Sequence, residues 1–273
     1  MIGAVLAALL LLSIAIPERD ANGLPHLRSE SVIVRDVASG AILLEKNADA
    51  LRPIASVTKL ISALVLAKSS TIADRELTVL EEDKDRFKWS RSRLAVGTTC
   101  RASELLSLSL SASDNRAMHA LVRGEGHERA RFAELMTKQA RALGMKRSKF
   151  VDPAGLHAEN VSTARELLLV LEAAAKNSLV CAASTESDVE VEGARRPLRF
   201  GNTNRFVRSS AWKVIVSKTG YTVEAGRNLV LRAEVDERLV DMVFLGSREM
   251  ASVFGDAGRV RRWLKSRTAE AAR

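Results

Sequence analysis

A proline leads into a helical pattern at PIASVTKL, residues 53–60. The apolar residues of this pattern recur at helical spacing and fall on one face, behind Ser56. Ser56 and Lys59 are three residues apart and share a side of the helix, so the lysine can reach the serine hydroxyl. A serine in the first turn also lies at the positive end of the helix dipole, which stabilises developing negative charge. The segment therefore predicts a serine that is activated by a lysine.

The same SxxK spacing occurs again in Ser210-Ala211-Trp212-Lys213. An isolated match of this kind usually marks no more than a surface helix. The interpretation of Ser56 therefore depends on the motifs that follow it.

A polar triplet, Ser113-Asp114-Asn115, follows a leucine-rich helical run. Such a triplet is most often a helix cap or a turn. In a catalytic role, Ser113 could relay a proton between a base and a leaving amine. Asn115 could hold a substrate amide or orient a lysine.

A second triplet, Lys218-Thr219-Gly220, ends an apolar strand. Lys218 offers a cation, and Thr219 offers a hydroxyl for a terminal carboxylate. Gly220 would let a substrate lie against the strand edge, because no Cβ stands in the way.

The motifs stand in the order SxxK, SxN, KTG, with Ser113 57 residues after Ser56. This ordered triple is the signature of penicillin-binding proteins and class A β-lactamases. Ser210 does not fit the order and lies at the start of a strand. Ser56 is therefore the candidate nucleophile.

The rest of the chain predicts an α+β fold. The segments Ser31–Val37 and Ala41–Glu45 read as a hairpin, and residues 56–176 are mostly helical. Later strands, which would join the hairpin in one sheet, are expected at Val189–Val191, Trp212–Val216, Leu229–Val235 and Leu239–Leu245. An apolar face of Val260, Trp263 and Leu264 then marks a C-terminal helix. We expect a site in the cleft between the sheet and the helical lobe.

Composition narrows the function classes. The 273 residues suit one domain, or two lobes around a cleft, and 47% hydrophobic residues is ordinary globular composition. A net charge of +9 favours an anionic partner such as a wall polymer, or is simply a solvated basic surface. The basic residues are scattered and aromatic residues are only 4%, so no nucleic acid partner is predicted. The two cysteines do not make a disulfide framework.

The first 15 residues, MIGAVLAALLLLSIA, are apolar but shorter than the ~20 that span a bilayer as a helix. They resemble the core of a secretory signal, with cleavage after Ala15 or Gly23. An uncleaved anchor and a buried helix of a cytosolic protein are the alternatives. We expect a signal peptide over residues 1–23 and a catalytic domain over 24–273. Its sheet lobe would cover about 30–60 and 180–268, and its helical lobe about 70–175.

Several longer blocks resemble the D-alanyl-D-alanine endopeptidase branch (the penicillin-binding protein 7 type) of the low-molecular-mass penicillin-binding proteins, or serine DD-peptidases. They are PIASVTKL, SRSRLAVGT, ASDNRA, LGMKRSKFVDPAGL, NVSTAREL, NTN, SKTGYTVEAGRNLV and DAGRVRRWL. The resemblance implies a five-stranded antiparallel sheet flanked by helices, with a helical lobe that carries the SxN motif. The chain departs from the pattern at Ile61-Ser62, Met118-His119, Asn228 and Cys100, none of which is a catalytic position.

The resemblance also implies a mechanism. Ser56 attacks the carbonyl of a D-Ala–X bond, and Lys59 takes its proton; burial and the like charge of Lys218 would keep Lys59 neutral. The N–H groups of Ser56 and Tyr221 form an oxyanion hole. Ser113 passes the proton to the leaving amine. Substrate is held by Asn115, Lys218, Thr219, Gly220 and Tyr221.

No metal or cofactor is expected. The four histidines, His26, His119, His127 and His157, show no zinc spacing, and each fits a surface or helix residue. A β-lactamase would need a glutamate that activates the deacylating water, and the one candidate, Glu166, is explained by a capping box opening at Thr163.

The expected function is hydrolysis of D-Ala–meso-diaminopimelate crosslinks in peptidoglycan by a periplasmic enzyme. The alternatives are a D-Ala-D-Ala carboxypeptidase acting on stem pentapeptides and a non-catalytic penicillin-binding wall protein. The expected partners are peptidoglycan peptide stems, with β-lactam antibiotics as covalent inhibitors. No membrane anchor is expected after signal removal, because the final RTAEAAR is short and polar.

Overall fold

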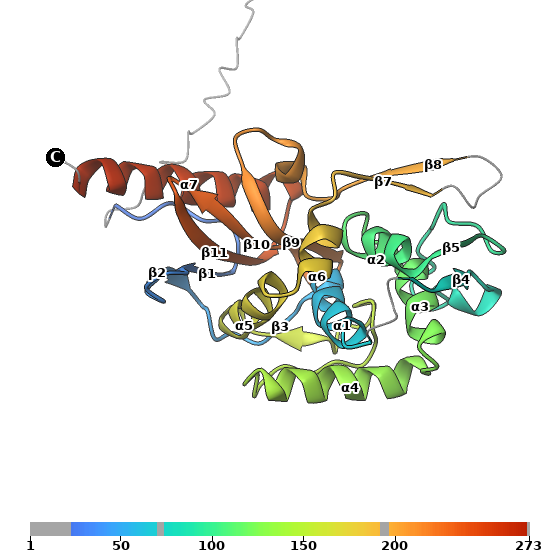
Figure 1. Ribbon diagram of the computed structural model, residues 1–273. Coiled ribbons are helices and arrows are strands. Elements are labelled where there is room, and N and C mark those ends of the chain that lie inside the picture. Colours follow the sequence, from blue (N-terminus) through green and yellow to red (C-terminus); the bar gives the residue numbers. More distant parts are fainter. Residues whose placement is uncertain (1–22, 70–73, 192–196, 272–273) are drawn as a thin grey trace, which may run out of the picture.

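The computed structural model describes residues 23–69, 74–191 and 197–271 (Figure 1). Its centre is a five-stranded antiparallel sheet in the order β2-β1-β11-β10-β9. The strands are β1 (Ser31–Asp36), β2 (Ile42–Lys46), β9 (Lys213–Thr222), β10 (Gly226–Val235) and β11 (Arg238–Ser247). The N-terminal hairpin thus joins the late strands, and the predicted five-stranded sheet is confirmed. The predicted signal peptide lies almost wholly outside the described residues.

One predicted strand lies elsewhere. Val189–Val191 belongs to β7 (Asp188–Val191), which pairs with β8 (Leu198–Gly201) in a separate two-stranded sheet. Figure 1 shows this ribbon extending away from the main sheet above the helical lobe. The prediction was wrong because alternating apolar residues indicate a strand but do not identify its partner.

Two further strand pairs are too short to have a sequence period. They are β3 (Arg52–Pro53) with β6 (Val161–Ser162), and β4 (Glu76–Thr78) with β5 (Thr99–Arg101). The first pair joins the segment before Ser56 to the segment before α5 (Ala164–Ala175).

The two faces of the main sheet pack against different helices, because successive side chains of a strand point to opposite faces. Val32 and Phe244 pack against α7 (Met250–Ala271), where the predicted apolar face of the C-terminal helix is buried. Ile33 and Val243 point the other way, into the core that the sheet shares with the remaining helices. Figure 1 shows α7 on one side of the sheet and α1 (Thr58–Leu66), α5 and α6 (Ser178–Thr185) on the other.

A buried ion-pair row crosses three strands of this sheet. Asp241 on β11 stands opposite Arg35 on β1 and Arg232 on β10. Its carboxylate is fully buried and accepts from Arg232 at 2.7 and 2.9 Å and from Arg35 at 2.7 Å. A slip of one residue would leave a buried charge without its partner, so the row holds the register.

The helical lobe contains α1 (Thr58–Leu66), α2 (Ala102–Leu110), α3 (Asn115–Gly124) and α4 (Arg129–Ala142), with 3-10 turns η1 (Ala55–Val57) and η2 (Glu81–Asp83); a third turn, η3 (Arg205–Arg208), precedes β9. The sequence predicted one apolar face for the first helix. Instead, α1 is buried on nearly all sides, from Thr58 to Leu64 and at Leu66. This helix runs through the middle of the molecule and carries Lys59 into the core.

The structure also describes the cysteines, one of the histidines and the apolar helices. Cys100 and Cys181 are both free thiols. His119 lies on α3 but is only 2% exposed, so it is a core residue. None of the helices in the described ranges is, alone, long and apolar enough to cross a membrane; α5 and α6 pass that test only as a pair bent by 106°.

Candidate active site

A cleft of about 340 Å³ lies between the edge strand β9, the start of α1 and the loop that precedes α3. Most of the predicted site residues line it: Ser56, Ser113, Asn115, Thr219, Gly220 and Tyr221. Lys59 and Lys218 are buried beneath it, at 0% and 1% exposure. The fold therefore brings all eight predicted residues to one place. Because β9 is the last strand in the sheet, its outer edge is available to an extended peptide.

Ser56 is held in a tight turn, η1, directly before α1. The preceding residue, Ala55, has a φ of 47°, a left-handed conformation that an alanine rarely adopts. Gly155 lies immediately behind, where an added Cβ would stand 2.0 Å from the carbonyl oxygen of Ala55. Strain of this kind persists only where the surrounding structure enforces it, and it is typical of functional sites.

Lys59 makes three contacts through its amine. Nζ lies 2.8 Å from Ser56 Oγ, 2.6 Å from Asn115 Oδ1 and 2.9 Å from Ala154 O. The last two partners can only accept, so they take two N–H groups. A neutral amine then has its lone pair free to face the serine hydroxyl, which is the arrangement that a general base needs.

Burial lowers the pKa of Lys59 to about 8 from its usual 10.5. The carboxylates of Asp152, Asp114 and Asp85 oppose this shift. The sequence interpretation named repulsion between Lys59 and Lys218 as a second cause. The two buried amines do repel each other: burial, followed by the charge of Lys59, lowers the pKa of Lys218 well below its usual value.

Lys218 joins the sheet to the helical lobe. Its Nζ donates to Ser113 Oγ and to the carbonyl oxygen of Thr219, both at 2.9 Å. Ser113 itself has a left-handed φ of 62°. The first motif is similar, because the left-handed residue there, Ala55, directly precedes Ser56. Asp114 then caps α3 by accepting from the N–H of Ala117.

Asn115 uses both ends of its amide within the protein. Oδ1 accepts from Lys59, and Nδ2 donates to Ser90 Oγ at 2.8 Å. The sequence left open whether Asn115 holds a substrate amide or orients a lysine, and the structure shows its contact with Lys59.

Gly220 has a packing role in addition to the substrate-binding role predicted from the sequence. An added Cβ would stand 2.8 Å from the carbonyl oxygen of Ile54 and 3.1 Å from the nitrogens of Ser56 and Val57. The absent side chain thus faces the turn that carries Ser56. Gly220 allows the strand to approach that turn, and Ser56 and Tyr221 line the same cleft.

Sequence reasoning assigned no role to several other residues that line the cleft: Ser90, Arg91, Thr203, Arg227 and Asn228. Their signal was present only as the blocks SRSRLAVGT, NTN and AGRNLV. Thr219 donates to Thr203 Oγ1 at 2.6 Å, and the guanidinium of Arg227 lies 3.5 Å from the centre of the Tyr221 ring.

Glu166 stands apart from this cleft. Its N–H donates to Thr163 Oγ1, so the predicted helix cap is present. Its carboxylate, however, accepts from the N–H groups of Arg147 and Ser148, both at 2.8 Å. The reciprocal half of the predicted capping box was therefore wrong, because this carboxylate holds a neighbouring loop.

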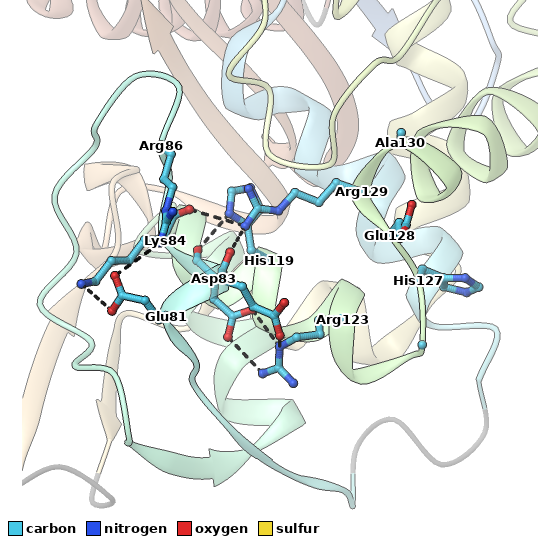
Figure 2. Close-up of a pocket in the computed structure, with 12 residues that line it drawn as sticks. Glu81, Asp83, Lys84, Arg86, His119, Arg123, His127, Glu128, Arg129 and Ala130 are labelled. Carbon is cyan, nitrogen blue, oxygen red and sulfur yellow. Dashed lines mark hydrogen bonds and ion pairs between the residues drawn. The ribbon is translucent and has the colours of Figure 1, made fainter.

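A larger depression, of about 870 Å³, lies on the helical lobe (Figure 2). Its charged groups bind one another: Arg123 pairs with Asp83 at 2.9 Å, and His119 Nδ1 lies 3.0 Å from the carbonyl oxygen of Asp83. The described residues that line it include no serine, threonine, cysteine or tyrosine. The same part of the chain holds no group of three His, Cys, Asp or Glu that could bind a metal. Ser56, the predicted nucleophile, instead lines the smaller cleft, with Lys59 buried beneath it.

The comparisons with known proteins identify the family of the chain. Residues 18–249 match the model of the Peptidase_S11 family, described as D-alanyl-D-alanine carboxypeptidase. The chain is 36% identical to a D-alanyl-D-alanine endopeptidase of Pseudomonas aeruginosa, over 89% of this chain and 80% of that protein. It is 31% identical to a protein of the same name from Escherichia coli, over 89% and 79%.

Solved structures share the fold. A point mutant of the Streptomyces K15 DD-transpeptidase superposes with a TM-score of 0.80 at 25% identity, over 88% of this chain and 98% of that one. A D-alanyl-D-alanine carboxypeptidase of Mycobacterium tuberculosis gives 0.80 at 20% identity, over 93% and 95%. The resemblance drawn from the sequence blocks is confirmed. The chain belongs to the Peptidase_S11 family of serine-type DD-peptidases.

Proposed function

We propose that this protein is an exported DD-endopeptidase that hydrolyses D-Ala–meso-diaminopimelate crosslinks of peptidoglycan through an acyl-enzyme on Ser56. One observation carries the proposal above the others. The hydroxyl of Ser56 opens on the cleft and lies 2.8 Å from a buried lysine whose other two contacts are hydrogen-bond acceptors.

The substrate stem would add to the free edge of β9 as an extended strand. Lys59 takes the proton of Ser56 as Oγ bonds to the D-Ala carbonyl carbon. General-base catalysis of this kind is worth roughly 10²–10⁴-fold in rate. The N–H groups of Ser56 and Tyr221 would hold the oxyanion, and one such donor contributes roughly 3 kcal/mol.

The C–N bond then breaks, and the leaving amine takes the proton that Lys59 received. Ser113 is placed to pass it, because its hydroxyl lies in the cleft and is bound to Lys218. Water attacks the ester, and its proton returns the hydroxyl to Ser56. Side chains of this protein are thus placed to accept and donate the protons that move in these steps.

The charges of the cleft fit a crosslinked stem as the leaving group. Arg91 and Arg227 line it, and Arg227 lies over the ring of Tyr221. A diaminopimelate residue brings carboxylates to this end of the cleft, where guanidinium groups bind them well. The net charge of +9 would keep the enzyme near an anionic wall.

The similarities of sequence support the same choice. The relatives named endopeptidase are 31–36% identical to this chain, whereas those named carboxypeptidase are 25–29% identical. Carboxypeptidase action on stem pentapeptides is the second candidate, because it shares the acyl-enzyme step and matches the family description.

Three further proposals accompany this function. The apolar segment at residues 1–15 serves as a secretory signal, so the enzyme acts in the periplasm. Its partners are the peptide stems of peptidoglycan, and β-lactam antibiotics acylate Ser56. Through crosslink cleavage it contributes to wall growth and cell shape.

A matched pair of substrates tests the proposal. Purified enzyme is given a D-Ala–meso-diaminopimelate crosslinked dimer and a pentapeptide monomer, and the products are followed by mass spectrometry. We expect the dimer to fall to monomers faster than the monomer releases free D-Ala. Rapid release of D-Ala beside an intact dimer would establish the carboxypeptidase instead.

A further inference from the structure

We propose that Asp85, acting through Ser90, fixes the orientation of the Asn115 amide and thereby aims the lone pair of Lys59 at Ser56. Asp85 and Ser90 are positioning residues. They lie in a loop to which neither the three motifs nor the family description gives a role. The inference rests on the proposed role of Lys59 as the base, but not on which wall peptide is cut.

The three groups form a continuous chain of hydrogen bonds that ends at the base. Ser90 Oγ donates to Asp85 Oδ2 at 2.7 Å, and Asn115 Nδ2 donates to Ser90 Oγ at 2.8 Å. Asn115 Oδ1 then accepts from Lys59 Nζ at 2.6 Å. The chain joins a loop residue to the catalytic amine in three bonds.

The direction of this chain is set at Asp85. That carboxylate is 6% exposed and also accepts from the N–H groups of Phe87, Lys88 and Ser90 at 2.9, 3.0 and 3.0 Å. Burial alone would raise the pKa of Asp85, but these bonds and the Ser90 hydroxyl hold it below its usual value of 3.8. The group is therefore ionised at neutral pH and can only accept.

Each following step has one possible direction. Because Asp85 can only accept, Ser90 donates its single hydroxyl proton to Asp85. Ser90 Oγ can then only accept a hydrogen bond from Asn115. Asn115 must then turn its NH₂ toward Ser90 and its carbonyl oxygen toward the lysine. Lys59 accordingly donates to Asn115.

The second N–H of the amine is taken by a different segment. Ala154 O accepts it at 2.9 Å, in a turn where Asp152 Oδ1 accepts from the N–H groups of Ala154 and Gly155 at 2.8 and 2.7 Å. With both hydrogens of a neutral amine directed away, only the lone pair remains for Ser56. Two buried carboxylates, Asp85 and Asp152, thus orient the base through two separate segments.

The loop is also tied down at its far side. Lys88 pairs at 2.5 Å with Glu224, which lies in the turn between β9 and β10. Ser92, two residues after Ser90, donates to Asp114 Oδ2 at 2.6 Å. These bonds anchor the loop but do not lie on the path to Lys59, which makes Ser92 a matched control.

The experiment compares Ser90→Ala with Ser90→Thr, Ser92→Ala and the wild type. Each full-length protein is acylated with a fluorescent penicillin under single-turnover conditions from pH 6 to pH 10. Ser90→Ala leaves every charge near Lys59 in place, namely Asp85, Asp114, Asp152 and Lys218. A change in its pH profile therefore reports hydrogen bonding.

Without the Ser90 hydroxyl, the Asn115 amide is free to turn over. Its NH₂ would then face Lys59 and occupy the lone pair, and the acylation rate at the plateau falls by about 10-fold, the worth of one hydrogen bond. An N–H donor beside the amine also favours its neutral form, so the rising limb of the profile moves to lower pH. Ser90→Thr restores both, and Ser92→Ala leaves the limb where it is.

The outcomes are distinct. A lower plateau with the limb at lower pH supports the proposal. If Ser90→Ala only loosens the loop, water would reach Lys59 and the rising limb would move to higher pH, which would overturn the proposal. A pH profile equal to that of the wild type would overturn it as well. If Ser90→Ala does not fold, Asp85→Asn gives the plateau readout, and an unchanged plateau there rejects the chain. A wild-type protein that penicillin does not acylate would instead reject the proposed function.

Discussion

Substitution of Gly220 gives the sharpest prediction, because backbone atoms lie against the position that a side chain would occupy. In Gly220→Ala the new methyl carbon would stand 2.8 Å from Ile54 O and 3.1 Å from the nitrogens of Ser56 and Val57. Backbone atoms in a tight turn cannot rotate away as a side chain does. Overpacking of this kind costs about 1–3 kcal/mol.

For a domain of this size that cost lowers the melting temperature by roughly 2–12 °C, at about 2–4 °C per kcal/mol. The displaced turn carries the nucleophile, and a shift of about 1 Å costs roughly 10²-fold in rate. We therefore expect Gly220→Ala to lose stability and penicillin acylation together. Circular dichroism melts and fluorescent penicillin labelling of the same preparation measure both quantities.

Gly258→Ala is the matched control. Its added Cβ would lie 3.7 Å from the end of the Arg262 side chain, an ordinary contact in helix α7, and alanine is favoured over glycine there by about 0.5–1 kcal/mol. This variant should melt no lower than wild type. If Gly220→Ala also melts at the wild-type temperature and loses only acylation, then Gly220 clears space for substrate and our reading of the packing is refuted.

The remaining predictions concern charge. The rate of acylation should rise with pH and level off above about 8, because burial lowers the pKa of Lys59 to about 8 and only the neutral amine is a base; a flat profile between pH 6 and 9 would contradict this. Burial lowers the pKa of His119 from 6.5 to about 4, so the unfolded chain binds this proton first and stability falls as pH decreases from 6.5 toward 4, by roughly 3 kcal/mol. Urea melts of His119→Gln should show a shallower decline over this window, and an equal slope would reject it. Asp241→Asn removes the carboxylate that the buried Arg232 pairs with and leaves Arg35 only its longer pair with Glu172, and it should cost roughly 3–5 kcal/mol, or about 6–20 °C. The surface ion-pair control, Asp236→Asn, should cost less than about 1 kcal/mol, and equal losses for the two variants would contradict the buried row.

The meeting of Ser56, Lys59 and the third motif at one cleft could be predicted, because they are short patterns in a fixed order. Ser56 and Lys59 are one helical turn apart, so local geometry alone brings them together. The meeting of Ser113 with Lys218 is a long-range contact, and only the order of the motifs indicated it. The five-stranded sheet followed from strands whose apolar residues alternate.

Other features depend on contacts that a local pattern does not encode. Ser90 lies in an irregular loop without a period, and its partner Asn115 is 25 residues away. The position of α1 in the middle of the core made Lys59 fully buried, whereas its sequence indicated one apolar face. The close approach of Gly220 to the turn packed against β9 is a long-range contact, so the sequence indicated the residue but not this packing role.

The measurement that tests the account most directly is the mass of the penicillin adduct. Wild-type protein is incubated with benzylpenicillin, digested and mapped by tandem mass spectrometry, with Ser56→Ala treated in parallel. We predict one covalent adduct, on the peptide that contains Ser56, and none in the variant. An adduct on Ser210, or one that persists in Ser56→Ala, would show that the nucleophile lies elsewhere.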